Sequence, residues 1–250
     1  MKKFFAAVCL IFLIVTSFGF VALKLGLLGS DDNYFNQHLR NRLAAKPWLR
    51  NLFSLHYDGD SRADYLGSRY DNILIEVDAM DKTMPNREAL DILVQKIQTI
   101  TAKPTVYLLS QTDLPYDLTI DDNRIHELVS SNRDLKSAGN TAVIYLLYVS
   151  TKTEDESILG STFEDFGIVL YYQTLQEFTQ TAPRTAVLYE ASTALHEFGH
   201  QLGLDHNQQQ NCLMNARVES AVSVLQLPGA VVTDFCSLEL EILKNQRQSY

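Results

Sequence analysis

Apolar residues along the chain form one long run and several shorter runs, and these predict different elements. The long run extends from Phe4 to Leu23 without a charged residue, directly after Lys2 and Lys3. About 20 residues at a rise of 1.5 Å each can cross the hydrocarbon core of a bilayer, and two preceding basic residues favour a cytoplasmic N-terminus. We therefore expect residues 1–29 to form a signal-anchor transmembrane helix, with the rest of the chain outside the cytoplasm.

A cleaved signal peptide is the alternative for this segment. Ser17 and Gly19 are small residues placed for cleavage after Gly19, which would yield a secreted or periplasmic protein. The chain stays apolar beyond that point, which favours the anchor. The next stretch, residues 30–69, is polar and charged with scattered aromatic residues, and an amphipathic helix is expected from His38 to Leu52. We interpret this stretch as a stalk or an N-terminal wrap.

The shorter runs alternate between the periods of strand and helix. A Pro suited to a first helical turn precedes apolar residues at helical spacing within residues 85–100. Runs typical of buried strands cover residues 72–80, 104–110, 141–150 and 165–175. This order predicts an α/β or α+β domain over residues 70–250, in which helices pack on a twisted mixed sheet.

A later helical pattern carries the residues with a specific chemistry. From Thr185 to Leu202, apolar residues recur every three or four positions and predict one buried stripe. His196 and His200 are four residues apart on a neighbouring stripe, so both imidazoles can bind one metal ion. Glu197 is the next residue round the helix, where it can reach a water on that ion without being a ligand.

The residues after this helix complete the predicted site. Gly203 is placed to end the helix, because glycine takes the left-handed conformation there at no steric cost. The resulting turn allows His206 to return toward the same ion as a third ligand. A purely structural zinc site is usually closed by a fourth ligand and has no need of a carboxylate such as Glu197. The set therefore favours a catalytic metal.

Five residues match the pattern H-E-x-x-H-x-x-G-x-x-H: His196, Glu197, His200, Gly203 and His206. At these positions the chain resembles the metzincin clan of zinc endopeptidases. Met214 adds to the resemblance, because metzincins carry a methionine in a tight turn beneath the metal. The resemblance implies a single catalytic Zn²⁺ on the three histidines, with Gly203 and Met214 as structural support. It also implies that Glu197 activates a zinc-bound water for hydrolysis of a peptide or protein substrate.

Two groups within the clan share further features with this chain. The H-x5-C-x-M spacing after the third histidine is similar to that of archaemetzincins. Asn207 and Glu239, however, stand where those proteins have cysteines, which argues against a second, structural zinc. Cys212 and Cys236 also resemble the adamalysin type, in which cysteines near these places form disulfides. Two cysteines outside the cytoplasm are themselves read first as a disulfide.

The resemblance also suggests where a substrate would lie. The strand at 166–172 is expected to be the sheet edge along which an extended peptide binds through main-chain hydrogen bonds. Residues 215–232 are expected to form the wall of the pocket for the side chain after the scissile bond, which hints at an apolar preference there. Some metzincins have a tyrosine just after the turn methionine, but Asn215 stands at that position. No such phenol is therefore expected.

Composition excludes one class of partner. The formal net charge is −9 and Lys and Arg form no cluster, so a nucleic-acid partner is not expected. Two alternatives without catalysis stay open. One is a zinc-stapled binding module on a membrane anchor, and the other is a membrane-anchored interaction protein whose function resides in residues 30–69. Calcium binding by the acidic residues 154–156 also stays open.

Overall fold

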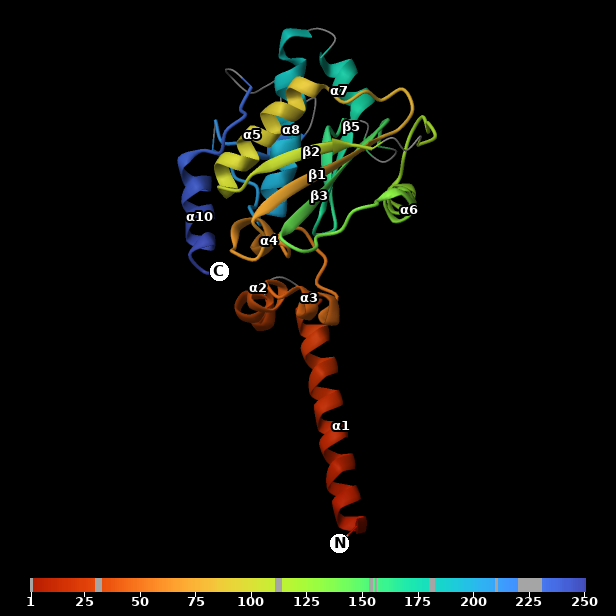
Figure 1. Cartoon of the computed structure of the whole chain (residues 1–250), viewed down its shortest axis with the longest axis vertical. Helices are drawn as coiled ribbons and strands as arrows, with labels where there is room; N and C mark the ends of the chain where they lie inside the picture. Colours follow the sequence, from red (N-terminus) through yellow and green to blue (C-terminus); the bar gives the residue numbers. More distant parts are fainter. Residues whose placement is uncertain are drawn as a thin grey trace. The chain divides into compact units, whose positions relative to one another are not determined.

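The computed structural model divides the chain into two compact units, Met1–His56 and Tyr57–Tyr250 (Figure 1). Each unit has an apolar core of its own. The residues that the structure describes are 2–29, 33–110, 114–152, 155, 157–179, 183–209, 211–219 and 231–250.

The first unit consists of helices. Its first helix, α1 (Lys2–Leu27), includes a stretch that is long and apolar enough to cross a membrane, and most of that stretch is exposed. The single helix expected from His38 to Leu52 is wrong, because this region is broken into short pieces. Pro47 begins the last piece, since proline fits a first helical turn but lacks the amide hydrogen that a continuing helix needs. These pieces are η1 (Asn36–Arg40), α2 (Asn41–Ala44) and α3 (Pro47–Phe53).

The second unit contains the predicted mixed sheet, and the α/β fold class is confirmed. Four strands are parallel, while the fifth, β4, runs antiparallel to β5 at one edge. Across the sheet the strands are β2 (Thr105–Leu109), β1 (Asn72–Ala79), β3 (Thr141–Val149), β5 (Gly167–Tyr171) and β4 (Gly160–Phe163).

Two expectations about the strand at 166–172 are wrong. It is not the sheet edge, because β4 pairs with its outer side through a tight hairpin. The apolar run to residue 175 is also not all strand, since β5 ends at Tyr171 and α7 (Tyr172–Thr179) follows without a break. The four residues of β4 carry no apolar run of their own, so periodicity gave no signal for this edge.

Helices cover both faces of the sheet (Figure 1). Two of them, α5 (Arg87–Thr101) and α8 (Pro183–Gln201), contribute to the core on one face, and α6 (Asp122–Asn132) contributes to the core on the other. Successive side chains of β3 alternate between these two cores, as the period of a strand requires. Both faces of β3 are therefore buried, which explains its nearly continuous apolar sequence.

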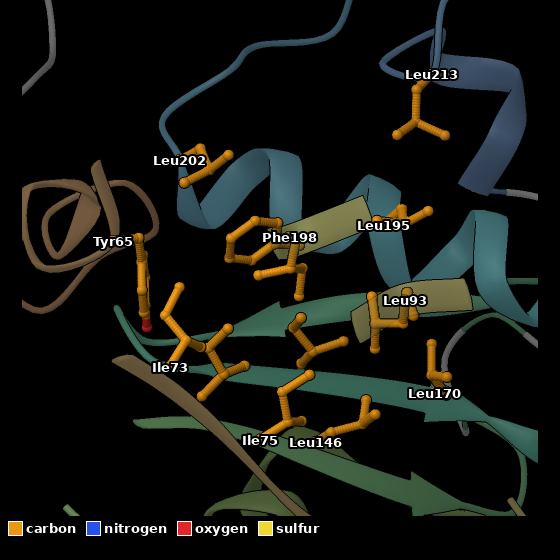
Figure 2. Close-up of a cluster of buried hydrophobic side chains, with 14 of the residues drawn as sticks. Tyr65, Ile73, Ile75, Leu93, Leu146, Leu170, Leu195, Phe198, Leu202 and Leu213 are labelled. Carbon is orange, nitrogen blue, oxygen red and sulfur yellow. The ribbon is translucent and has the colours of Figure 1, made fainter. Parts of the chain in front are cut away.

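The larger core holds α8 against the sheet, and in Figure 2 the Phe198 ring lies between this helix and strand residues such as Ile73. Tyr65 of α4 (Arg62–Leu66) packs edge-on against Phe198, with ring centroids 5.6 Å apart. Residues 57–69 thus lie within the second unit, although sequence alone led us to group them with the stalk. At the C-terminal end, α10 (Ser237–Arg247) packs through Leu243 into the same core.

Candidate metal and catalytic site

The three histidines of the motif meet at one point. His196 and His200 come from α8, and His206 comes from the segment after that helix. The Nε2 atom of His206 lies 3.1 Å from the Nε2 atoms of both other imidazoles. His196 is buried, His200 is half-buried and His206 is exposed, so the cluster opens to solvent on one side.

Hydrogen bonds fix the tautomers of the two helical histidines. His196 Nδ1 lies 2.7 Å from the carbonyl oxygen of Leu213, and His200 Nδ1 lies 3.0 Å from that of Leu204. A carbonyl oxygen only accepts, so both Nδ1 atoms must donate. In the neutral rings the Nε2 lone pairs therefore point into the cluster, where a cation relieves their repulsion.

The donor set fits zinc. Two nitrogens that are each about 2.05 Å from a tetrahedral zinc ion lie roughly 3.3 Å apart, close to the separations seen here. Orientation of ligating imidazoles by backbone carbonyls is also typical of zinc sites. Among the described residues, the cluster holds three possible ligands and no fourth. A tetrahedral ion would keep one position open for water or substrate.

Glu197 directly follows His196 on α8 but is not part of the ligand cluster. Its side chain is 1% exposed and faces Gly160, the first residue of the edge strand β4. A Cβ added to Gly160 would lie 3.2 Å from Glu197 Oε1 and 2.7 Å from Thr193 Cγ2. The missing side chain at this position therefore makes room for the carboxylate between helix and strand.

The helix ends where the sequence predicts, at a left-handed glycine. Gly203 has a φ of 76°, and its amide donates to His200 O at 2.8 Å. A second constraint was not visible in sequence. Gly59, with a φ of 79°, packs its backbone against Gly203, and a Cβ at Gly203 would lie 2.6 Å from Arg62 Nη1. The turn that brings His206 back is thus held by the segment that begins the second unit.

Met214 packs against Gly199, a glycine of the motif helix. A Cβ at Gly199 would lie 2.2 Å from Met214 Sδ, so no other residue fits there while the methionine keeps its place. The backbone after the third histidine is tied to the same turn, because Asn207 N donates to Met214 O at 2.8 Å. Met214 is thus linked both to the motif helix and to the segment that follows the third histidine.

A disulfide and a carboxylate hold this turn to α10. Cys212 and Cys236 are joined, with their Cα atoms 4.9 Å apart. Glu239, in the first turn of α10, accepts hydrogen bonds from Met214 N and Asn207 Nδ2, both at 2.8 Å. In the sequence Glu239 stands out only as a departure from a cysteine pattern, because the partners it holds are distant in sequence.

Another buried acid lies two turns before the histidines on α8. Glu190 accepts hydrogen bonds from Asn86 N at 2.9 Å and from the Tyr148 hydroxyl at 2.8 Å. Burial raises the pKa of Glu190 to about 7, although these two hydrogen bonds oppose the shift. No sequence pattern indicates this group, because its hydrogen-bond partners come from β3 and from the N-cap of α5.

Some predicted features lie outside the described residues. Most of the expected pocket wall does so, since 220–230 are not described, and so do Glu154 and Glu156 of the acidic loop. Within that loop the structure describes Asp155, whose Oδ1 accepts hydrogen bonds from the amide and hydroxyl of Ser157. The pocket wall and calcium binding therefore stay predictions.

Comparison with known proteins gives matches to zinc peptidases. The family model of matrixins matches residues 137–229, which include the whole histidine motif. This match supports a metzincin-like zinc metallopeptidase. No curated protein matches it. Solved structures of similar fold include archaemetzincin from Methanopyrus kandleri, with 16% identity and a TM-score of 0.54, covering 72% of this chain and 98% of that one.

A second solved structure supports the same fold for this metzincin-like chain. The zinc-dependent peptidase from Methanocorpusculum labreanum is 12% identical, with a TM-score of 0.50, and the match covers 69% of this chain and 99% of that one. At such low identity the likeness concerns the fold and carries no residue roles. The expectation of a metzincin-like zinc peptidase is nevertheless confirmed by the matrixin match and by this fold.

Proposed function

We propose that this metzincin-like chain is an endopeptidase with one catalytic zinc ion, held by His196, His200 and His206, and with Glu197 as its base. The observation that carries the proposal is the convergence of the three Nε2 atoms, two of them from the helix that also carries the buried Glu197. When bound there, zinc supplies a Lewis acid that polarises a carbonyl and makes water nucleophilic near neutral pH. Four protein ligands would close such a site, and the described residues provide three.

Glu197 is the proton carrier in this mechanism. It directly follows His196, so one helix, α8, carries both the carboxylate and two of the three imidazoles. The carboxylate takes a proton from the attacking water and delivers it to the nitrogen of the leaving amine when the C–N bond breaks. Its position between α8 and Gly160 holds it in place through both transfers.

The edge strand β4 provides a binding surface for an extended peptide. On one side β4 pairs with β5, and no described strand pairs with its other side. Because Gly160 of β4 lies against Glu197, a peptide added to this edge would run past the catalytic carboxylate. Main-chain hydrogen bonds to β4 would give affinity without a strong sequence requirement. The scissile bond would lie level with the beginning of the strand.

We place this reaction outside the cytoplasm. The apolar stretch of α1, from Cys9 to Leu27, has the length of a membrane span near the N-terminus. The disulfide between Cys212 and Cys236 supports an oxidising compartment, since such bonds are rare in the cytosol. A membrane anchor with an exported catalytic unit accounts for both features, and a secreted or periplasmic form after cleavage near Gly19 is the alternative.

The competing function is a zinc-stapled binding module. A buried carboxylate next to three histidines has no purpose in such a staple, and it costs free energy to bury. The proposal is tested by comparing wild type with Glu197→Gln on a peptide library, after zinc analysis of each protein. We expect equal zinc content and a loss of kcat of about 10²- to 10⁴-fold.

Two control variants sharpen this experiment. Glu241→Gln changes an exposed acid on α10 and should retain full activity, while His200→Ala should lose both zinc and cleavage. Cleavage by Glu197→Gln at the wild-type rate would contradict the role of the base. Zinc binding by wild type without any cleavage would support the staple instead.

A further inference from the structure

A buried carboxylate on α10 accepts hydrogen bonds from chain segments that adjoin or contact the histidines of the site. Glu239 is 1% exposed, and each of its oxygens accepts two hydrogen bonds. Oε1 accepts from Met214 N and from Asn207 Nδ2, each at 2.8 Å. Oε2 accepts from Leu213 N at 3.2 Å and from Cys236 N at 2.8 Å. Four donors from three separate segments thus converge on one side chain.

Two of these segments lead directly to histidines. Asn207 follows His206 in the chain, so its anchored side chain limits how far that ligand can move. Leu213, whose amide is held by Glu239, presents the carbonyl that accepts from His196 Nδ1 at 2.7 Å. One carboxylate therefore restrains the backbone of one ligand and the orienting partner of another.

We propose that Glu239 is a positioning residue of the metal site, which sets the zinc affinity of the three histidines without contacting the ion. This inference rests on the proposed function in so far as the histidines bind zinc. An ionised carboxylate offers acceptors on both oxygens, which four N–H donors require. An amide in its place would turn an NH₂ group toward two of those donors. The misplaced turn would then release the Leu213 carbonyl from its position beside His196.

The disulfide allows this role to be separated from folding. It joins Cys212 to Cys236 and so ties the same turn to the same helix independently of Glu239. Loss of the carboxylate should therefore leave the fold in place while the turn moves locally. Loss of an outer partner of a zinc ligand typically weakens metal binding by about 10- to 100-fold, and we expect that range for Glu239→Gln.

The experiment measures the zinc dissociation constant of the full chain in detergent, by competition with a chromophoric chelator. Three variants on α10 are compared with wild type: Glu239→Gln, Glu241→Gln and Leu243→Ala. Glu241 is exposed and controls for the change of charge, while Leu243 is buried in the core and controls for general destabilisation. The visible absorption of the Co²⁺-loaded proteins reports the ligand geometry.

We expect Glu239→Gln to weaken zinc binding about 10- to 100-fold and to change the Co²⁺ spectrum, and both controls to stay within threefold of wild type. Leu243→Ala should nevertheless lower the unfolding temperature. Should Glu239→Gln not fold, Asn207→Ala removes one of the four donors and should weaken zinc binding severalfold.

Unchanged zinc affinity in the first variant that folds would overturn the positioning role, as would an equal loss in Leu243→Ala. Failure of the proposed function looks different. It would appear as wild-type protein that binds zinc and cleaves no peptide.

Discussion

At the scale of single residues, the site depends on two glycines that give space to functional side chains. Gly160 has no conformational reason to be glycine, and its role is the close approach of β4 to Glu197. An alanine there would place a methyl group within 3.2 Å of the carboxylate and 2.7 Å of Thr193 Cγ2. Either the strand or the Glu197 side chain must then move.

We therefore expect Gly160→Ala to lower kcat/KM for a peptide substrate by about 10- to 100-fold, because a displacement of about 1 Å at a reacting group has an effect of that size. Zinc content should not change, since no ligand touches the strand residue. Steady-state kinetics and metal analysis measure both. Ser161→Ala on the same strand is the matched control, and equal activity of Gly160→Ala and wild type would show that Glu197 does not need this space.

Gly199 has the corresponding role for Met214. An alanine at this position would collide with Met214 Sδ, and overpacking of this kind usually costs about 1–3 kcal/mol. In Met214→Ala the severe collision is gone and the nearest remaining atom is Phe235 Cε1 at 3.1 Å. Alanine is also favoured over glycine inside a helix by up to about 1 kcal/mol. Gly199→Ala should thus destabilise wild type but be neutral or stabilising in Met214→Ala, as measured by urea unfolding. The same destabilisation in both backgrounds would place the conflict elsewhere.

At this scale, sequence spacing predicted the site residues whose positions depend on one helix and the turn after it. The positions of His196, His200 and Gly203 follow from the geometry of one helix and its end, and His206 follows from the turn. Gly160 and Glu239 could not be found in the same way, because their partners are 37 and 25 residues away and depend on how β4 and α10 pack. Tertiary contacts of this kind have no periodic signature in sequence.

At the scale of elements, Glu190 connects α8, the helix of the histidine motif, to α5 and to strand β3. This residue accepts hydrogen bonds from the N-cap of α5 and from Tyr148 at the end of β3. Its pKa in the folded state is about 7, above the ordinary value of 4.5, because burial disfavours the charged carboxylate. The folded state therefore binds a proton more tightly than the unfolded chain does.

The sign of the pH dependence follows from this shift. Protonated Glu190 contributes to the free energy of unfolding. This contribution is fully present below about pH 4.5 and is lost as pH rises through about 7, a total change of roughly 3 kcal/mol. Glu190→Gln keeps the acceptor for both donors but cannot ionise. Relative to wild type, this variant should become more stable between pH 5 and pH 8.5 in urea unfolding of the zinc-loaded proteins. The pH dependence of zinc binding is common to wild type and Glu190→Gln and cancels in the comparison. A difference in their free energies of unfolding that does not change with pH would therefore contradict a buried charge at Glu190.

Elements differ in how well sequence patterns predicted them. The long apolar run of β3 and the helical stripe of α8 are confirmed, because β3 is buried from residue 142 to 149 and α8 from residue 190 to 199. The edge strand β4 and helix α6 were missed. In β4 the four residues are glycine, serine, threonine and phenylalanine, and pairing with β5 rather than side-chain burial makes them a strand.

At the scale of the whole molecule, the two units have separate apolar cores. The core of the first unit is formed by residues between Leu23 and Leu55, and both cores of the second begin at Tyr65 or later. The metal ligands, Glu197 and the disulfide all belong to the second unit. Stability and zinc binding of that unit should therefore not require residues 1–56.

Removal of residues 1–56 tests this independence together with the membrane assignment. We expect residues 57–250 to fold as a water-soluble protein, to bind one zinc ion and to unfold within about 3 °C of the full chain, which corresponds to less than about 1 kcal/mol for a unit of this size. The full chain should instead sediment with membranes and stay there in alkaline carbonate, because α1 exposes its apolar side chains. Recovery of the full gene product in the soluble fraction, shortened near Gly19, would favour the signal peptide. Failure of residues 57–250 to fold would mean that the first unit completes the core of the second.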